Sequence, residues 1–448
     1  MKTLQKDLTT GNPGKIIFNF TLPIFIGNVF QQFYSMADTI IVGKFVGTKA
    51  LAAVGSTGTI MFLINGFILG MTAGFTVLTA QKFGAGDMKA MRKTVGNAAI
   101  LAIIMSLIMT VLGMMAMKPL LGIMKTPDDI FKDAYAYIMV ICGGIAAQML
   151  YNFLSSVLRA LGNSKVPLYF LILAALLNIV LDMVFIIAFH MGAAGAAIAT
   201  VIAQCVNFLL LLLASKQLAF LRAKEVPHKA ERLHWSRYLS VLLPLLFCEA
   251  SWSLGENVYA AIYGRMGTAE SAAMTLTAPI QGLVIGALCG LSQAAGVIVG
   301  KRLGGEDYDE AYQAAKRLMV YGAVGAAVLC TVVLLTSGAY VEIYRVSPTV
   351  KLMTRQILSV YAMAAPFKVL NMILGGGILR SGGRTAYVMG IDMLGTWAFG
   401  VPLGLLGAFV WRLPIAYVYL LLSLEGCVRF AISMAVFRRK RWMRRLDG

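Results

Sequence analysis

Polar side chains inside a long apolar segment are the first residues in this sequence that could do chemistry. Asn178 and Asp182 lie four residues apart within the apolar run 166–189, so on a helix they share one face. A carboxylate at bilayer depth costs roughly 2.5 kcal/mol or more. It stays there when it has a partner, faces a water-filled cavity or carries a proton. Asp182 is therefore the first candidate for a site inside a membrane.

The composition is that of a protein with many membrane spans. Of the 448 residues, 59% are hydrophobic and 13% are charged, and the mean hydropathy is +0.78. The six cysteines lie in apolar runs, so we expect free thiols rather than disulfides. No small-residue cleavage pattern precedes the first apolar run, so no cleavable signal peptide is expected.

Long apolar runs with polar or helix-breaking flanks predict an all-α polytopic membrane protein with twelve transmembrane helices. The sequence has neither a Gly-x-x-x-x-Gly-Lys-Ser/Thr loop nor a His-Glu-x-x-His motif, so we expect no ATP motor and no enzyme. The predicted spans are 16–41, 51–80, 94–117, 134–158, 166–189, 193–214, 238–263, 271–299, 318–338, 354–379, 386–410 and 413–437.

The basic residues indicate how the chain crosses the membrane. Most of the 39 Lys and Arg residues fall on the side that holds both termini, and such residues are enriched in cytoplasmic segments. This predicts a multi-pass protein of the inner (plasma) membrane with cytoplasmic N- and C-termini. The net charge of +19 is then a topology signal, and no nucleic acid is expected as a partner. Membrane lipids are expected partners, and a specific anionic-lipid site at the basic tail is an alternative to a simple anchor.

The sequence also repeats itself. The segment around Pro23 matches the segment around Pro244, and the turn at Arg159 matches the turn at Arg380 at the same spacing. An even number of spans separates the copies, so both have the same orientation, as in parallel repeats about an axis along the membrane normal. We predict two six-helix lobes around a central cavity: an N-lobe at 1–214, a cytoplasmic inter-lobe loop at 215–237 and a C-lobe at 238–448.

Distance from the predicted span ends places other polar residues at the depth of Asp182. Asp38 lies in the outer part of the first span, and Tyr137 and Thr200 lie in the outer halves of the fourth and sixth. No Lys or His accompanies them, and oxygen ligands without a fixed counter-cation suit a proton or Na⁺. The predicted coupling-ion residues are Asp38, Asn178, Asp182, Tyr137 and Thr200, and Na⁺ would bind at Asp38, Asn178 and Asp182. Alternatively, Asp38 caps a helix near the interface and Asp182 has a structural role.

The second lobe lacks this arrangement. Phe399 and Leu403 stand where Asn178 and Asp182 stand in the first. Glu256 in the seventh span is the best acidic candidate there, and a structural hydrogen bond is its alternative role.

Other charged residues of the second lobe have simpler interpretations. Glu425 and Arg429 are four residues apart in the order that favours a structural ion pair. Lys368 either pairs with a carboxylate or repels cations, and Asp392 is expected near the interface. The run Gly375-Gly376-Gly377 predicts a flexure of the tenth span rather than a phosphate site.

These residues together resemble the multidrug and toxic compound extrusion (MATE) transporters over nearly the whole chain. The resemblance rests on the twelve spans in two lobes, Pro23 and Asp38 in the first span, and the turn that begins at Arg159. It is strongest to the prokaryotic DinF-like branch, whose first lobe carries an Asp in helix 1 and Asn-x-x-x-Asp in helix 5. Asp38, Asn178 and Asp182 stand at those positions, and the branch's supporting Tyr and Thr would fall on Tyr137 and Thr200.

The NorM-like branch of the family uses a helix 7 Glu and a helix 10 Asp for Na⁺. Glu256 matches the first of these residues. No acid stands at the second position, near Lys368, which puts a second-lobe Na⁺ site in doubt.

The resemblance implies secondary active export by alternating access of two lobes, driven by H⁺ or Na⁺ and without another cofactor. The expected substrates are drug-like or toxic amphipathic organic compounds, often cationic, and the protein is expected to be a monomer. Alternatives are a flippase or exporter of a lipid-linked compound or specific metabolite, and an ion channel. Pro23 would weaken the first helix and let it bend for gating, whereas Pro23 and Pro244 could equally be static kinks.

Overall fold

The computed structural model describes residue 8 and residues 11–123, 126–216, 235–344 and 346–445. Within these ranges the chain is helical and contains no β-strand, which confirms the predicted all-α class. Eleven helices of the described residues are long and apolar enough to cross a membrane. The predicted span 238–263 is a further helix, of 32 residues, that is not among the eleven. The predicted inter-lobe loop lies mostly outside the described residues.

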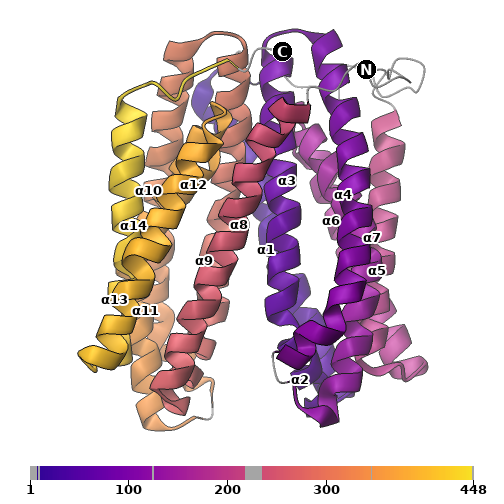
Figure 1. Ribbon diagram of the computed structural model, residues 1–448, viewed down its shortest axis with the longest axis vertical. Coiled ribbons are helices and arrows are strands. Elements are labelled where there is room, and N and C mark those ends of the chain that lie inside the picture. The colour runs from indigo at the N-terminus through magenta and orange to yellow at the C-terminus, as the bar shows by residue number, and fades with distance from the viewer. Residues whose placement is uncertain (1–7, 9–10, 124–125, 217–234, 345, 446–448) are drawn as a thin grey trace. The chain divides into compact units, whose positions relative to one another are not determined.

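The helices belong to two compact units. Unit 1 comprises Ile26–Trp235 among the described helices. Its elements are α1 (Pro13–Phe45, from Ile26 on), α2 (Thr48–Ser56), α3 (Gly58–Gly84), α4 (Met88–Ile123), α5 (Asp128–Ala160), α6 (Lys165–Met183), the π-helical turn η1 (Val184–Ala188) and α7 (Gly192–Lys216). Helix α5 lies at the centre of this unit, because it packs against α3, α4 and α7 (Figure 1).

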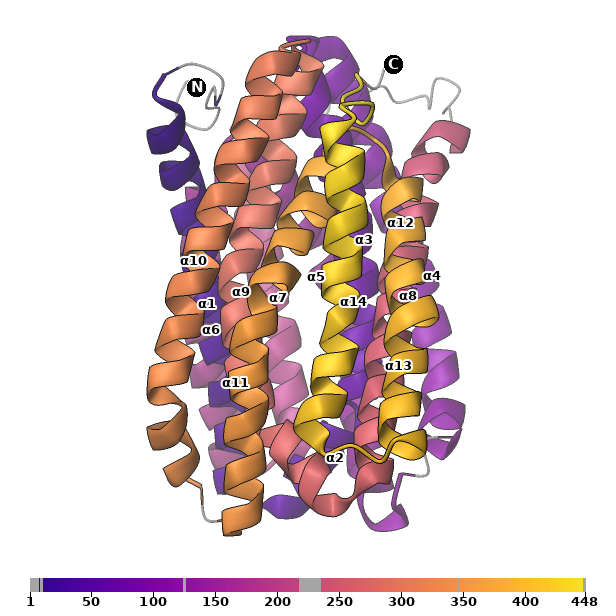
Figure 2. The same cartoon turned by 90° about the vertical axis from the view of Figure 1, so that its left-hand side faces the viewer.

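Unit 2 comprises Thr9–Phe25 and Ser236–Asp447 among the described residues. Its elements after α1 are α8 (Trp235–Met266), α9 (Thr268–Gly304), α10 (Tyr308–Glu342), α11 (Pro348–Asn371), η3 (Met372–Leu379), α12 (Thr385–Met393), η4 (Leu394–Gly400), α13 (Val401–Leu405), η5 (Leu406–Val410) and α14 (Ile415–Arg438). Figure 2 shows α14 between α11 and the segment that runs from α12 to α13, and α14 packs against both.

The second predicted span is wrong as a single helix. The range 51–80 falls on two helices, α2 and α3, which are separated at Thr57. Gly55 and Gly58 flank the break, and glycine weakens a helix interior. The Thr57 hydroxyl donates to the Val54 carbonyl oxygen at 2.7 Å, which satisfies a polar group at the break.

Most helices extend beyond the predicted limits. The third predicted span, 94–117, lies inside α4, and the ninth, 318–338, lies inside α10. The added turns carry charged residues such as Lys89 and Glu342. Hydropathy marks only the apolar part of a helix, and the backbone hydrogen bonds continue past it.

The predicted flexure at 375–377 coincides with η3, where the helix widens to π-type turns. Such turns are rare and concentrate at functional or strained positions. Gly377 lies where η3 meets α9: a Cβ there would approach the Ser292 carbonyl oxygen and lie 2.8 Å from the Ala295 Cβ. The Ser292 hydroxyl in turn donates to the Met372 carbonyl oxygen at 2.7 Å. The two helices are therefore in backbone-level contact at Gly377.

Helix α1 is shared between the units. Its first part, up to Phe25, belongs to unit 2, and the rest, from Ile26, belongs to unit 1. In unit 2 a Cβ on Gly290 of α9 would lie 3.1 Å from the Phe25 backbone nitrogen, and in unit 1 one on Gly27 would lie 3.4 Å from Leu171 of α6. Pro23, which cannot donate a backbone hydrogen bond, therefore lies just before the point where α1 passes from one unit to the other.

We expect Gly377→Ala to destabilise the protein, because the new methyl group has no room against α9. Overpacking of this kind typically costs about 1–3 kcal/mol. Gly390→Ala in α12 is the matched control, since a Cβ there meets nothing within 4 Å. Thermal unfolding of the purified protein in detergent should show a lower melting temperature for Gly377→Ala alone. Equal melting temperatures for the two variants would contradict the close contact.

Candidate functional site

A directed chain of hydrogen bonds links three elements of unit 1. The Tyr34 hydroxyl of α1 donates to Thr200 Oγ1 of α7 at 3.3 Å. With the Asn178 amide oriented to satisfy both its ends, its oxygen accepts from Thr200 Oγ1 at 3.3 Å and from the Thr200 backbone nitrogen at 3.1 Å. Its nitrogen donates to Asp182 Oδ2 at 2.9 Å. Asn178 therefore holds the Asp182 carboxyl group in a fixed orientation.

The carboxyl groups of Asp38 and Asp182 interact electrostatically with each other. Two ionised carboxylates repel each other, so a proton on one of them or a bound cation would relieve that repulsion. Asp182 and Asn178 are fully buried. In the described part of the chain, no Lys, Arg or His forms an ion pair with either carboxyl group. The charge partner of this carboxyl pair would therefore be a proton or a cation from solution.

The five residues predicted as a coupling-ion site are brought together in unit 1. Tyr137 of α5 is buried and interacts electrostatically with Asp38, Asp182 and Tyr34. Thr200 is 9% exposed. Sequence reasoning missed Tyr34, although it lies four residues before Asp38 and hence on the same face of α1. This four-residue spacing is the feature of the sequence that could have identified Tyr34 as a member of the site.

Two oxygens of the carboxyl pair are available to an ion. Asp38 Oδ1 and Asp182 Oδ1 are buried and have no hydrogen-bond partner in the described residues. They could accept a hydrogen bond from a protonated partner or contact Na⁺, for which oxygen ligands are suitable.

Local helix geometry positions Asp182. It is the penultimate residue of α6, and the chain widens directly afterwards into the π-type turn η1. There the Phe189 backbone nitrogen donates to the Val184 carbonyl oxygen at 3.1 Å. The break in regular α-helical geometry therefore begins next to the buried carboxyl group, as is common at functional sites.

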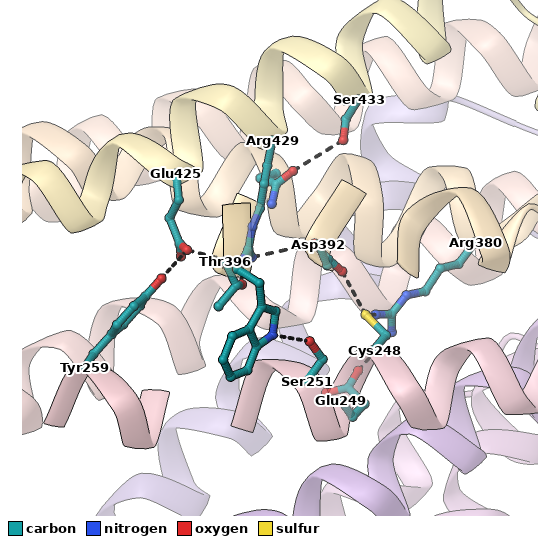
Figure 3. A network of polar contacts seen from close by, with 12 residues as sticks. Cys248, Glu249, Ser251, Tyr259, Arg380, Asp392, Thr396, Glu425, Arg429 and Ser433 are labelled. Carbon is teal, nitrogen blue, oxygen red and sulfur yellow. Dashed lines mark hydrogen bonds and ion pairs between the residues drawn. The ribbon is translucent and has the colours of Figure 1, made fainter. Parts of the chain in front are cut away.

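In unit 2, carboxylates inside the helix bundle form ion pairs with arginines instead. Arg429 of α14 lies 3.4 Å from Glu425 and 3.6 Å from Asp392 of α12 (Figure 3). It also donates to the Thr396 hydroxyl, and the Tyr259 hydroxyl donates to Glu425. The Glu425–Arg429 ion pair is confirmed. Asp392 also belongs to this network, and its expected position near the interface stays a prediction.

The network continues towards the other end of α8. The Cys248 thiol donates to Asp392 at 2.8 Å, and Arg380 reaches both Cys248 Sγ at 3.4 Å and Glu249 at 3.2 Å (Figure 3). Every carboxylate named here has a cation or a hydroxyl as a partner. This part of unit 2 is accordingly built as a structural ion-pair network.

Glu256 and Lys368 interact with each other within unit 2. Lys368 is half-buried, and its ammonium group lies 5.4 Å from the Tyr419 ring centroid. It interacts electrostatically with Glu256 and Glu425, which favours the carboxylate-pairing role for Lys368. The Glu256 side chain is exposed and interacts with Lys368 and Trp252. The second lobe's candidate acid therefore already has a cationic neighbour.

The comparisons with known proteins agree on one family. The MatE family model matches residues 23–184 and again 244–406, so its two matches begin at Pro23 and Pro244. "Probable multidrug resistance protein YpnP" of Bacillus subtilis is 38% identical over 204 residues, 45% of this chain and 46% of that protein. "Probable multidrug resistance protein YoeA" of the same organism is 23% identical over 96% of this chain and 97% of its own length.

A solved structure has the same fold over nearly the whole chain. The crystal structure of a MATE protein in complex with MaL6 superposes with a TM-score of 0.89 and covers 98% of each chain at 20% sequence identity.

We expect Arg429→Leu to destabilise the protein strongly, because it leaves Glu425 and Asp392 buried without their cation. Breaking one side of a buried ion pair typically costs about 3–5 kcal/mol. The matched control is Lys351→Leu, whose partner Glu342 is 71% exposed; exposed pairs are worth at most about 1 kcal/mol. Thermal unfolding and the yield of folded protein would be compared. Similar values for both variants would show that the network adds little to stability.

Proposed function

This chain belongs to the MatE family, a family of membrane transporters rather than enzymes, and on that premise we propose that it exports drug-like organic compounds in exchange for protons. In this proposal the Asp38–Asp182 pair carries the coupling proton. The multi-pass membrane protein would have both termini in the cytoplasm and act as a monomer. The regions 1–214 and 238–448 would serve as the two lobes that alternate access.

The observation that supports this proposal is the neighbouring position of two carboxyl groups that have no cationic partner among the described residues. Loss of the shared proton would leave two like charges side by side at bilayer depth, which is costly. Binding and release of that proton therefore change the local energy far more than titration of an ion-paired carboxylate would. Such a pair can bias a conformational equilibrium.

The surrounding hydrogen bonds give the proton a defined place. Asn178 donates to Asp182 and fixes its orientation, while Tyr34 and Thr200 tie α1 to α7 next to Asp38. Tyr137 of α5 interacts electrostatically with both carboxyl groups of the cluster. Because Asp38 stands on α1 and Asp182 on α6, protonation acts on the contact between these two helices.

Substrates of drug-like character fit the relatives whose names describe multidrug resistance. The ionisable groups of unit 2 support the same class of substrate. Its buried arginines are engaged with Glu249, Asp392 and Glu425, and Lys368 has acidic neighbours. A transporter for a lipid-linked anion would need basic groups that are available to its cargo.

We expect Asp182→Asn to abolish substrate-driven proton movement, since an amide cannot exchange the shared proton. Purified protein in proteoliposomes would be supplied with an acidic outer compartment and a cationic dye as substrate, with internal pH and Na⁺ recorded together. Asp128→Asn is the matched control, because Asp128 is an exposed acid at the start of α5. Transport near the wild-type rate in Asp182→Asn would refute the assignment. Substrate movement driven by Na⁺ at equal pH would refute proton coupling.

We also propose that α1 bends at Pro23 during transport. Pro23 precedes the junction at which α1 passes from unit 2 to unit 1, whereas Pro244 lies within a helix that belongs to unit 2 from Ser236 on. Only α1 carries a member of the carboxyl pair. Pro23→Ala should therefore slow efflux severalfold more than Pro244→Ala at matched protein levels, measured as dye efflux from cells. Equal losses in the two variants would indicate static kinks.

A further inference from the structure

Three aromatic rings stack where α10 begins and α14 ends. The Tyr312 ring lies on Phe437 with centroids 4.8 Å apart, and Phe437 lies on Trp442 at 5.6 Å. Trp442 is only 1% exposed, and its indole nitrogen donates to the Phe437 carbonyl oxygen at 3.1 Å. Gly382 packs so closely on the Trp442 backbone that a Cβ would not fit. The chain after α14 is therefore firmly seated on this end of unit 2.

Two lysines converge on the outermost ring of this stack. The Lys316 ammonium group lies 4.6 Å and the Lys440 ammonium group 4.7 Å from the Tyr312 ring centroid. Phe437 covers one face of the Tyr312 ring, so both ammonium groups lie over the other face. Both lysine side chains are exposed. They come from α10 and from the segment after α14, so tertiary structure alone brings them together.

No carboxylate of the described residues forms an ion pair with either lysine. Two acids near the start of α10 are engaged with other cations: Glu306 pairs with Arg445, and Glu310 pairs with Arg302 at 3.4 Å.

The electrostatics of this arrangement favour an anion. Each ammonium group is attracted to the ring face, but the two positive charges repel each other within a Debye length. A group with several negative oxygens placed between them would remove that repulsion and accept hydrogen bonds from both. Lysine ammonium groups are compact charges that bind phosphate in this way.

The depth of the site matches a lipid head group. The apolar part of α10 begins near Leu318, so Lys316 lies about 3 Å before it along the helix axis. The polar head-group layer is about 5–8 Å thick on each side of the hydrocarbon core. Tyrosine and tryptophan are enriched at this level. An anion that reaches the two lysines would thus be part of the membrane surface.

We propose that Lys316, Lys440 and the Tyr312 ring form a binding site for the phosphate of an anionic phospholipid. The lysines contact the phosphate oxygens, and the stack of Tyr312, Phe437 and Trp442 supplies a rigid base. This site is independent of the carboxyl pair in unit 1. It would hold an annular lipid on unit 2, against the seated segment that follows α14.

Binding would be measured by native mass spectrometry of detergent-purified protein titrated with phosphatidylglycerol or phosphatidylcholine. The wild type should bind phosphatidylglycerol more tightly than phosphatidylcholine. In Lys316→Gln/Lys440→Gln this preference should fall by roughly thirtyfold, because each basic residue near an anionic surface is worth about one kcal/mol. Lys316→Arg/Lys440→Arg should largely retain it.

The matched control is Arg439→Gln/Arg441→Gln, which removes the same charge from two exposed residues of the same segment without touching the ring. An equal loss of binding in this control would overturn the site in favour of diffuse attraction to a basic surface. Unchanged binding in the lysine variant would also overturn it. Competition by millimolar inorganic phosphate would instead assign the lysines to a free anion and overturn the lipid as ligand.

Discussion

The cost of placing a charge in an apolar environment is the constraint on which this structure depends. Each buried ionisable group needs a partner, because the membrane offers no water to solvate it. Unit 2 meets the requirement with cations: Arg429 forms ion pairs with Glu425 and Asp392, and Arg380 forms one with Glu249. Asp38 and Asp182 of unit 1 have no such cation among the described residues, and we propose that they share a proton. A shared proton, unlike an ion pair within the protein, can be exchanged with solvent.

This difference gives two halves of common ancestry different roles. The family model matches both, from Pro23 and from Pro244, so they share a fold. Their polar residues have nevertheless diverged: Leu403 stands where Asp182 stands in the first half. The ion-pair network stabilises the packing of unit 2, because removing any one partner would leave a buried charge unpaired. In unit 1 the contacts of the carboxyl pair join α1, α6 and α7 through hydrogen bonds.

Interruptions of regular helix geometry accompany these polar groups. The π-type turn η1 follows Asp182 directly, and η4 contains Thr396, which accepts from Arg429. Such turns are rare and occur frequently at functional sites. Pro23 has a related effect in α1, since it removes one backbone hydrogen bond just before the junction between the units.

The sequence by itself determined the membrane class, the all-α fold and the repeat, because hydropathy and repeated motifs are local properties that survive in any arrangement of the helices. It also indicated Asp38, Asn178 and Asp182 through their cost in a bilayer and their spacing. Only the tertiary structure decided that the two carboxyl groups lie near each other, that Tyr34 joins them, and that Asp392 pairs with Arg429. The same holds for the break at Thr57 and the lysines over Tyr312. These features depend on distances between residues far apart in the chain, and hydropathy and periodicity carry no information about such distances.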